Sequence, residues 1–518
     1  MADSSLKGQV VKSGLVLAAL ATFAAAPAIG QTAEQNTRAA IARIEALNPS
    51  VNAVLAIDPT AIEEARALDR MRRARGPLFG MPLLIKDNIE ARGPLPTTAG
   101  SLVLKDNVTG RDATLVARLR GAGAVILGKT NLSEWANFRG DSSISGWSGL
   151  GGQVRNPHAL DRTPCGSSSG SGAAVAAGMV DAAIGTETDG SVTCPAAING
   201  IVGFKPTVGL VSRNHVVPLS HSQDTAGPMT RDVRTAALLL NAMAGSDVAD
   251  AATAEADARK VDYVAALRPD ALKGARIGVM RFATGWSPAV DVVFERALAV
   301  LKAQGAELVD IAKLPIDRRK MGDGEHQVLI SEFKADLNAY LAGTPASVKT
   351  RTLAEAIAFN TANGARELGL FGQETFIEAE ATKGLEDPVY KEARATSLRL
   401  AGTDGIDAML ASAGVVALVQ PTTAPAWPID AVHGDQGPDR GSAGSLAAIA
   451  GYPHLTVPMG KVKGLPVGLS FIGAKWDDAR MLALGHGYEQ AAGLTVLPGF
   501  AASVEEMPGV ADLLAPPR

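Results

Sequence analysis

The sequence is poor in the residues that metal sites and disulfide-rich scaffolds require. It has only two cysteines in 518 residues, Cys165 and Cys194, and they do not form a Cys-x-x-Cys pair. Its seven histidines never show the His-Glu-x-x-His spacing of a zinc site. We therefore expect no metal ion. The two cysteines could form one disulfide in an oxidising compartment, but two separate buried thiols are the simpler interpretation.

Charge of one sign and aromatic side chains are also scarce. The formal net charge is −4, no block of lysine and arginine stands out, and aromatic residues make up 4% of the chain. A protein that binds nucleic acid needs a basic surface for the phosphates, and a single-strand binder also needs aromatic rings for base stacking. We therefore expect no nucleic-acid partner.

Long hydrophobic runs are missing except near the N-terminus, where residues 14–26 are apolar. Lys7 and Lys12 precede this run, and the small residues after it allow cleavage after Ala28 or Gly30. The run is too short to cross a bilayer. It predicts a secretory signal peptide over residues 1–30 and an exported protein, periplasmic or secreted, without stable membrane insertion. The alternative is a buried N-terminal helix.

The rest of the chain alternates helical patterns with short apolar strands, which is typical of an α/β fold. Without an internal repeat or a clear linker, residues 31–518 predict a single large domain with a mixed, mostly covered central β-sheet surrounded by helices. Residues 260–400 are expected to be mostly helical, with one strand at 276–280. The other expected elements are helices over 37–47, 61–75, 113–122 and 173–180 and strands over 81–86, 124–128, 415–421, 455–458 and 467–473.

Three short motifs match catalytic patterns by letter but not by context. Residues 123–130 have the pattern of a phosphate-binding loop, yet their apolar middle predicts a buried strand. The segment Gly-Ser-Ser-Ser-Gly around Ser168 matches the nucleophile elbow of an esterase, with His486 as a partner, but no apolar strand precedes it. Ser331 and Lys334 match Ser-x-x-Lys inside a helical run, without companion motifs.

Two blocks rich in serine and glycine carry Ser167 and Ser191, which are 24 residues apart. The first contains Pro-Cys-Gly-Ser-Ser-Ser-Gly-Ser-Gly, and the second contains Gly-Thr-Glu-Thr-Asp-Gly-Ser. Together with the upstream segment Leu-Ile-Lys-Asp-Asn, which contains Lys86, they resemble the amidase signature family, with three motifs in the family's order. The resemblance covers about residues 37–490 and implies the amidase signature fold and hydrolysis of carboxamides without a metal or organic cofactor.

The resemblance assigns roles to three side chains: Ser191 is the nucleophile, Ser167 is a bridging serine that follows a cis peptide bond, and Lys86 is the base. A serine hydroxyl is a weak nucleophile and needs a base within hydrogen-bond reach. Lysine can serve only when neutral, so its pKa must fall from about 10.4 toward 7 or 8. Because Lys86 ends the apolar run 81–85, burial is expected to lower its pKa.

The segment before the nucleophile is expected to stabilise the oxyanion. Thr188, Asp189 and Gly190 would offer successive backbone N–H groups to the negative charge of the tetrahedral intermediate. Two positions depart from many family members, which have glycine where this chain has Asp189 and arginine where it has Thr193. The first departure places a carboxylate beside the nucleophile.

Several segments resemble bacterial peptide amidases in particular: residues 131–139, 145–148, 185–190 and 222–228. This resemblance implies removal of the C-terminal amide of peptides while internal peptide bonds stay intact. The partner would then be a peptide amide or another small amide, and no oligomeric state is predicted. Specificity is expected in a variable helical part, about 315–400, and in loops such as 137–150.

Four other interpretations remain open from the sequence. The chain could be an amidase for other small aliphatic or aryl amides, an esterase that uses Ser168 and His486, or an exported two-lobed solute-binding protein. It could also be the amide-hydrolysing component of a tRNA amidotransferase, although export argues against an intracellular tRNA substrate.

Overall fold

The computed structural model describes residues 31–71, 76–437 and 443–514. The predicted signal peptide, residues 1–30, lies outside the described residues. The strands share one large sheet, apart from the small hairpin of β4 and β5. They are β1 (Val54–Ile57), β2 (Pro82–Lys86), β3 (Val125–Thr130), β4 (Trp147–Ser148), β5 (Gly152–Gln153), β6 (Ala182–Glu187), β7 (Val202–Lys205), β8 (Thr225–Thr230), β9 (Arg276–Met280), β10 (Glu307–Ile311), β11 (Ala417–Pro421), β12 (His454–Val462) and β13 (Leu465–Ile472).

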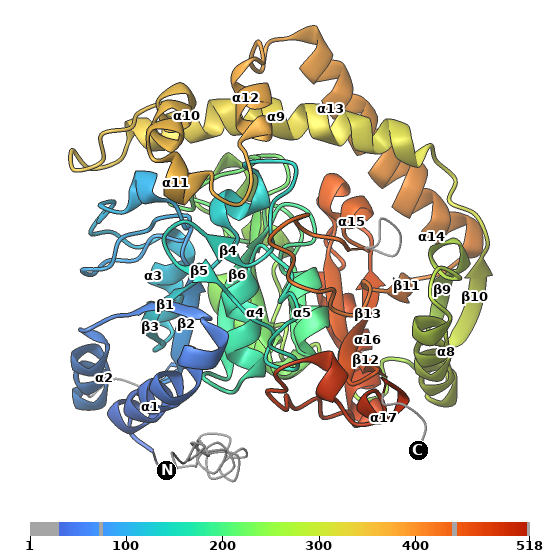
Figure 1. Cartoon of the computed structure of the whole chain (residues 1–518). Coiled ribbons are helices and arrows are strands. Elements are labelled where there is room, and N and C mark those ends of the chain that lie inside the picture. Colours follow the sequence, from blue (N-terminus) through green and yellow to red (C-terminus); the bar gives the residue numbers. More distant parts are fainter. Residues whose placement is uncertain (1–30, 72–75, 438–442, 515–518) are drawn as a thin grey trace, which may run out of the picture.

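Helices surround this sheet (Figure 1). They are α1 (Ala33–Val51), α2 (Ala61–Arg70), α3 (Thr114–Gly121), α4 (Ser169–Ala176), α5 (Thr193–Asn199), α6 (Val233–Met243), α7 (Ala256–Arg259), α8 (Pro288–Ala303), α9 (Arg318–Ala342), α10 (Leu353–Ala362), α11 (Gly364–Glu367), α12 (Glu374–Glu380), α13 (Pro388–Ala401), α14 (Ala408–Ala413), α15 (Gly444–Ala450), α16 (Asp478–Ala492) and α17 (Ala511–Leu514), with short 3-10 turns such as η5 (Arg281–Ala283). None of the helices in the described part of the chain is long and apolar enough to cross a membrane.

The order of strands in the large sheet is β1-β3-β2-β6-β8-β7-β12-β13-β11-β9-β10. β2 pairs in parallel with β3 and β6, and β9 pairs in parallel with β10 and β11. Antiparallel pairs join these two groups through β8, β7, β12 and β13. The prediction of one domain with a mixed sheet is confirmed. Parallel pairs occur where a helix connects the strands, which is why both faces of the sheet are covered.

The two faces of the sheet bury separate hydrophobic clusters. One cluster packs α3, α6, α8 and α16 against the sheet, and the other packs α1, α2 and α4 against it. Burial of these apolar side chains is the main source of stability for such a layered fold, at about 25 cal/mol per Å² of apolar surface removed from water. The sheet is therefore a rigid platform for the loops at the ends of its strands.

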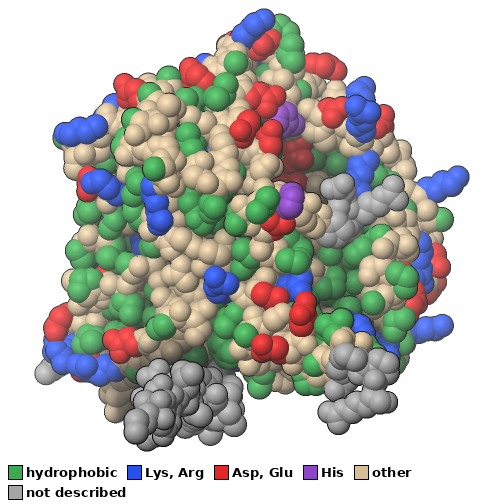
Figure 2. All heavy atoms as spheres, viewed as in Figure 1, with side chains coloured by type: hydrophobic (Ala, Val, Ile, Leu, Met, Phe, Trp, Pro, Cys, Tyr) green, Lys and Arg blue, Asp and Glu red, His purple; other side chains and the backbone are tan. Residues whose placement is uncertain are grey.

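Helices α9 to α13 form a cover over one end of the sheet (Figure 1). The prediction that residues 315–400 are helical agrees with these helices. The cover has its own apolar cluster, in which Phe333 and Phe376 pack with Trp135 of the main body. Figure 2 shows positive and negative side chains scattered over the face in view, without a large basic area.

Most expected strands and helices occur within a few residues of their predicted bounds. Residues 125–130 form the buried strand β3, so the phosphate-loop pattern at 123–130 is a chance match, as predicted. The expectation of a single strand within residues 260–400 was wrong, because β10 pairs with β9 at the edge of the sheet. Glu307 and Asp310 interrupt the apolar pattern of β10, as charged residues often do in edge strands.

Arg139 holds the cover to the main body. Its side chain is fully buried, its Nε lies 3.1 Å from Glu134 Oε1, and its guanidinium donates to the backbone oxygen of Glu367 in α11. The guanidinium also lies 4.1 Å from the ring centre of Phe371. In turn, the Glu367 carboxylate accepts a hydrogen bond of 2.8 Å from the backbone N–H of Leu102.

We expect Arg139→Met to lower the free energy of unfolding by about 3 kcal/mol, because Glu134 would stay buried without its cation. Urea denaturation measures this change. Adding Glu134→Gln should recover part of the loss, since the uncompensated charge is then gone. Arg319→Met removes an exposed arginine of α9 and should change the stability by less than about 0.5 kcal/mol. Equal effects of the two arginine substitutions would contradict the structural role of Arg139.

Candidate active site

Lys86 ends β2 in the interior of the protein. The side chain is fully buried, and its Nζ lies 2.7 Å from Ser167 Oγ, 2.9 Å from Thr186 Oγ1 and 3.2 Å from Thr186 O. No carboxylate lies within ion-pair distance of Nζ among the described residues. A lysine in this position therefore has hydrogen-bond partners but no counter-ion.

Burial lowers the pKa of Lys86 to about 7, although the more distant charges of Asp224 and Glu187 act in the opposite direction. Removal from water disfavours the ammonium form, and three neutral oxygen partners do not restore what hydration would supply. A substantial fraction of Lys86 is therefore neutral near pH 7. This value agrees with the expectation for a lysine base.

Ser167 lies in the turn that leads into α4. The peptide bond between Gly166 and Ser167 is cis, as the family resemblance implied. A Cβ at Gly166 would lie 2.1 Å from Ser133 Oγ, so a side chain does not fit at this position. The backbone oxygen of Ser167 accepts a hydrogen bond of 3.1 Å from Ser133 N. The turn is thus fixed on both sides, and the buried Ser167 hydroxyl meets Lys86.

Ser191 follows the turn after β6 and lies next to the first serine block. Its backbone oxygen accepts a hydrogen bond of 3.2 Å from Ser168 N, which brings the two blocks together. The Ser191 side chain is 8% exposed, and its hydroxyl makes no hydrogen bond within the described residues. Gly190 has a φ of +76°, and a Cβ there would meet nothing within 4 Å. The turn therefore faces open space on the side of Gly190.

The backbone N–H groups of residues 188–191 also make no hydrogen bond to described residues. The next two do: Glu187 Oε2 accepts from Val192 N at 2.8 Å and from Thr193 N at 2.9 Å. Glu187 thereby fixes the start of α5 and leaves the preceding N–H groups available. Successive free N–H groups in a turn can bind an anion.

The loop before β8 fixes the turn that precedes Ser191. Thr188 Oγ1 donates to Asp224 Oδ1 at 2.6 Å, and Asp224 Oδ2 accepts from the N–H groups of Leu219 and Ser220 at 2.8 and 2.9 Å. Burial raises the pKa of Asp224 to about 6, so the carboxylate is mainly ionised at pH 7. The sequence reasoning missed Asp224, although it lies in the segment 222–228 that resembles peptide amidases.

The carboxyl group of Asp189 has a second carboxyl as its neighbour, that of Glu325 in α9. Burial, with the nearby charge of Glu187, raises the pKa of Asp189 to about 6, although a hydrogen bond with Glu325 acts in the opposite direction. Burial and the charge of Asp189 raise the pKa of Glu325 well above its usual range. Glu325 also accepts a hydrogen bond of 2.9 Å from Gln223 Nε2, which lies 3.3 Å from Thr188 O. The cover helix thus reaches the turn before Ser191. The sequence had no signal for this contact, because Glu325 lies in a segment without a recognised motif.

The family model of the amidases matches residues 35–482. This chain belongs to the amidase signature family. A probable amidase of Arabidopsis thaliana is 37% identical over 484 residues, which cover 91% of this chain and 89% of the relative. A glutamyl-tRNA(Gln) amidotransferase subunit of Roseiflexus castenholzii is 39% identical over 477 residues, with coverage of 88% and 91%. The solved structure of native peptide amidase from Stenotrophomonas maltophilia is 50% identical, with a TM-score of 0.85, and covers 91% of this chain and 96% of its own.

The protein is therefore an amidase, a hydrolase that acts on carbon–nitrogen amide bonds. The predictions of the family, of the fold and of this class of enzyme are confirmed.

The two cysteines of this amidase form a disulfide, so the preference for two separate thiols was wrong. The Cα atoms of Cys165 and Cys194 are 6.0 Å apart and 29 residues apart in sequence. Cys165 lies two residues before Ser167, and Cys194 lies three residues after Ser191. The bond therefore ties the two serine blocks together. Sequence alone could not decide this pairing, because it depends on the contact between α5 and the turn before α4.

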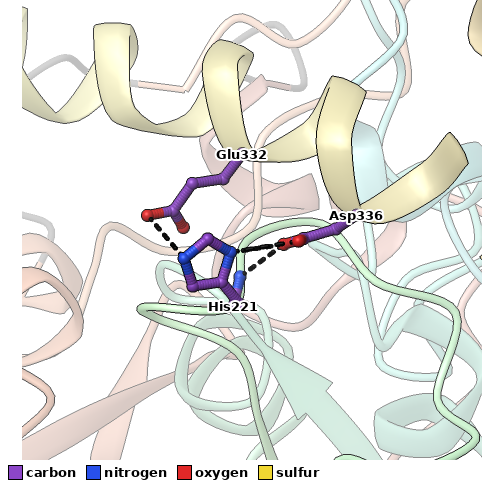
Figure 3. Close-up of side chains that lie close together, drawn as sticks. All are labelled: His221, Glu332 and Asp336. Carbon is purple, nitrogen blue, oxygen red and sulfur yellow. Dashed lines mark hydrogen bonds and ion pairs between the residues drawn. The ribbon is translucent and has the colours of Figure 1, made fainter. Parts of the chain in front are cut away.

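His221 fastens the loop before β8 to the cover helix of the amidase (Figure 3). Its ring lies between two carboxylates of α9, with Nδ1 at 2.9 Å from Asp336 and Nε2 at 3.4 Å from Glu332. Glu332 also accepts from Ser220 Oγ and from Tyr390 OH. The hydrogen bond to Asp336 raises the pKa of His221. These contacts position the loop that carries Asp224.

The structure does not bring Ser168 and His486 together. The Ser168 hydroxyl donates to Thr186 O at 3.0 Å and accepts from Thr186 N at 3.1 Å, so it is fully used within the fold. His486 lies on α16 and pairs with Glu489 instead. Ser331 accepts from Gln327 within α9, which agrees with a chance match there.

Proposed function

We propose that this amidase removes the C-terminal amide of peptides through an acyl-enzyme, with Ser191 as nucleophile, Ser167 as proton relay and Lys86 as base. The observation that carries the proposal is the contact of 2.7 Å between Lys86 Nζ and Ser167 Oγ in a fully buried place. Ser167 is adjacent to the residue whose N–H binds Ser191 O. These contacts place Ser167 between the lysine and the turn of Ser191, so we assign it the transfer of the proton from Ser191 to Lys86, a substantial fraction of which is neutral near pH 7.

The reaction begins when Ser191 Oγ attacks the amide carbon and its proton passes to Ser167, whose own proton moves to Lys86. The tetrahedral oxyanion is stabilised by the free N–H groups of Thr188, Asp189, Gly190 and Ser191. The relay then returns a proton to the nitrogen, the carbon–nitrogen bond breaks and ammonia leaves. Water attacks the ester to Ser191 by the same route, and the carboxylate is released with the serine restored.

The substrate class is supported by a relative of known structure. The peptide amidase of Stenotrophomonas maltophilia is half identical over nearly the whole chain. The similarity to a tRNA amidotransferase subunit supports the same chemistry with another substrate. Within the family, hydrolysis of other small amides is the alternative. An esterase with Ser168 and His486 is disfavoured by the separate hydrogen bonds of these residues.

The pH dependence of activity tests the role of Lys86. Because only the neutral amine accepts a proton, kcat/KM should rise with pH, about tenfold per unit below the pKa of about 7, and level off above it. Ammonia release from a peptide amide between pH 5 and 9 gives this profile. A flat profile through pH 7 would exclude Lys86 as the base.

Substitutions separate this role from general damage. Ser191→Ala and Lys86→Met should each lower kcat by about 10,000-fold, because the nucleophile or its base is lost. Lys105→Met removes the same charge from an exposed lysine and should keep full activity. Ser168→Ala and His486→Ala together test the esterase alternative, because that mechanism requires each of the two substitutions to abolish activity.

A panel of amides tests the substrate class. We expect ammonia release from N-acetylated dipeptide amides, with kcat/KM at least about tenfold above that for simple aryl or aliphatic amides. Free peptides without the amide should stay uncleaved. Turnover of aryl or aliphatic amides with none of peptide amides would remove the assignment to peptide amides while leaving the amidase intact.

We also propose that the protein is exported. The basic and apolar pattern of residues 1–30 and the disulfide between Cys165 and Cys194 both support this proposal, since disulfides persist in oxidising compartments. Expression of the full chain in a Gram-negative host should yield periplasmic protein without free thiols, with an N-terminus at residue 29 or 31. Cytoplasmic protein that keeps residue 1 would contradict export.

A further inference from the structure

A cavity of about 360 Å³ opens between η5, the first turns of α9 and the start of α15. These elements come from three distant parts of the chain, and their apolar residues make up much of the wall. The wall includes Phe282, Trp286, Leu314, Met321, Ser445 and Leu446. A space of this size holds an aromatic or large aliphatic group together with part of a peptide backbone.

The cavity adjoins the turn that leads to Ser191. Ser445 lines the cavity, and its hydroxyl lowers the pKa of Asp189, so the two side chains are neighbours. The preceding residue, Gly444, packs so closely that a Cβ there would lie 2.4 Å from Asp189 Oδ1 and 3.1 Å from Gly190 N. Gly190 is bonded directly to Ser191, and Gly444 lies between the lining residues Ala443 and Ser445, so this part of the cavity wall packs against the turn of the nucleophile.

Helix α9 makes the same connection from the opposite side. Met321 lines the cavity, and Glu325, one turn further along the same face, neighbours Asp189. The cavity therefore lies beside Asp189 and extends along α9 toward the N-terminus of that helix. Arg318, which also lines the cavity, stands about 10 Å before Glu325 along the helix axis.

The chemistry of the amide limits what this space can hold. The leaving group of a primary amide is ammonia, which is no larger than water. Any large space beside the nucleophile can therefore serve only the acyl portion. We propose that this cavity is the subsite for the acyl portion of the amide. It selects a bulky apolar or aromatic side chain on the C-terminal residue of the peptide and an acidic side chain on the residue before it. The inference rests on the amide hydrolysis at Ser191 proposed above.

The preference for an acidic group comes from Arg318. This arginine is exposed and makes no ion pair or hydrogen bond within the described residues. An unpaired guanidinium at the outer end of an apolar cavity attracts a carboxylate that stands beyond the buried side chain. A peptide amide with Phe at its C-terminus and Glu before it satisfies both parts of the subsite.

Filling the cavity tests the apolar part. The measured quantity is the ratio of kcat/KM for N-acetyl-Phe-amide to that for N-acetyl-Gly-amide, with ammonia release as the assay. Leu446→Trp narrows the cavity from α15 and should lower this ratio about tenfold. Ala283→Phe narrows it from η5 and should lower the ratio in the same way, so the test does not depend on one variant being stable.

Leu497→Trp is the matched control, because Leu497 is 45% exposed and does not line the cavity. Its Phe-to-Gly ratio should equal that of the wild type. An unchanged ratio in both cavity variants, with a wild type that releases ammonia, would overturn the subsite and leave the amidase function standing. A wild type that releases ammonia from neither substrate would overturn the proposed function, and the subsite with it.

Charge reversal tests the acidic preference. Arg318→Glu should lower kcat/KM for N-acetyl-Glu-Phe-amide relative to N-acetyl-Gln-Phe-amide about threefold, and added salt should reduce this effect. Arg319→Glu makes the same change of charge on the neighbouring residue, which is exposed and does not line the cavity. Equal effects of the two variants would show that the net charge of α9, and not Arg318, sets the preference. That result would overturn the role of Arg318 in selecting an acidic residue.

Discussion

The removal of Lys86 from water is the constraint on which the rest of the site depends. An ammonium ion in contact with three oxygen atoms and no carboxylate is poorly stabilised, so the pKa of Lys86 falls to about 7. The parallel pairing of β2 with β3 and β6 provides the burial, because both faces and both neighbours of β2 are occupied. The fold thus converts an ordinary lysine into a group that can accept a proton.

The turn before Ser191 needs support from every side because it leaves its own N–H groups unpaired. Glu187 fixes the start of α5, Asp224 holds Thr188, and the disulfide joins α5 to the first serine block. The loop that carries Asp224 is in turn held by His221 between two carboxylates of α9 (Figure 3). These connections hold the turn in place while its own N–H groups stay available for the oxyanion of the proposed reaction.

The helices α9 to α13 have two roles: they line part of the proposed substrate cavity, and they form a cover that is attached to the main body. Glu325 reaches the turn before Ser191 from the same helix whose first turns line the cavity. Arg139, with Glu134 and the backbone of Glu367, attaches this cover to the main body in a place closed to water. We therefore expect substitutions in the cover to affect the active site through these packed contacts.

The main elements and the three side chains at the centre of the site are predictable from the sequence because their signals are local. Lys86 ends a continuous apolar strand, and the two serines lie in glycine-rich turns of a recognisable family. β10 escaped prediction because its charged residues conceal the strand pattern, and β8 because a glycine and a proline lie inside it. The disulfide, the carboxylates of Asp224 and Glu325 beside the turn, and the cavity that leads away from it were found only in the folded protein. These features join segments that are distant in sequence, so they arise when the sheet and its cover pack, and no local pattern of residues encodes them.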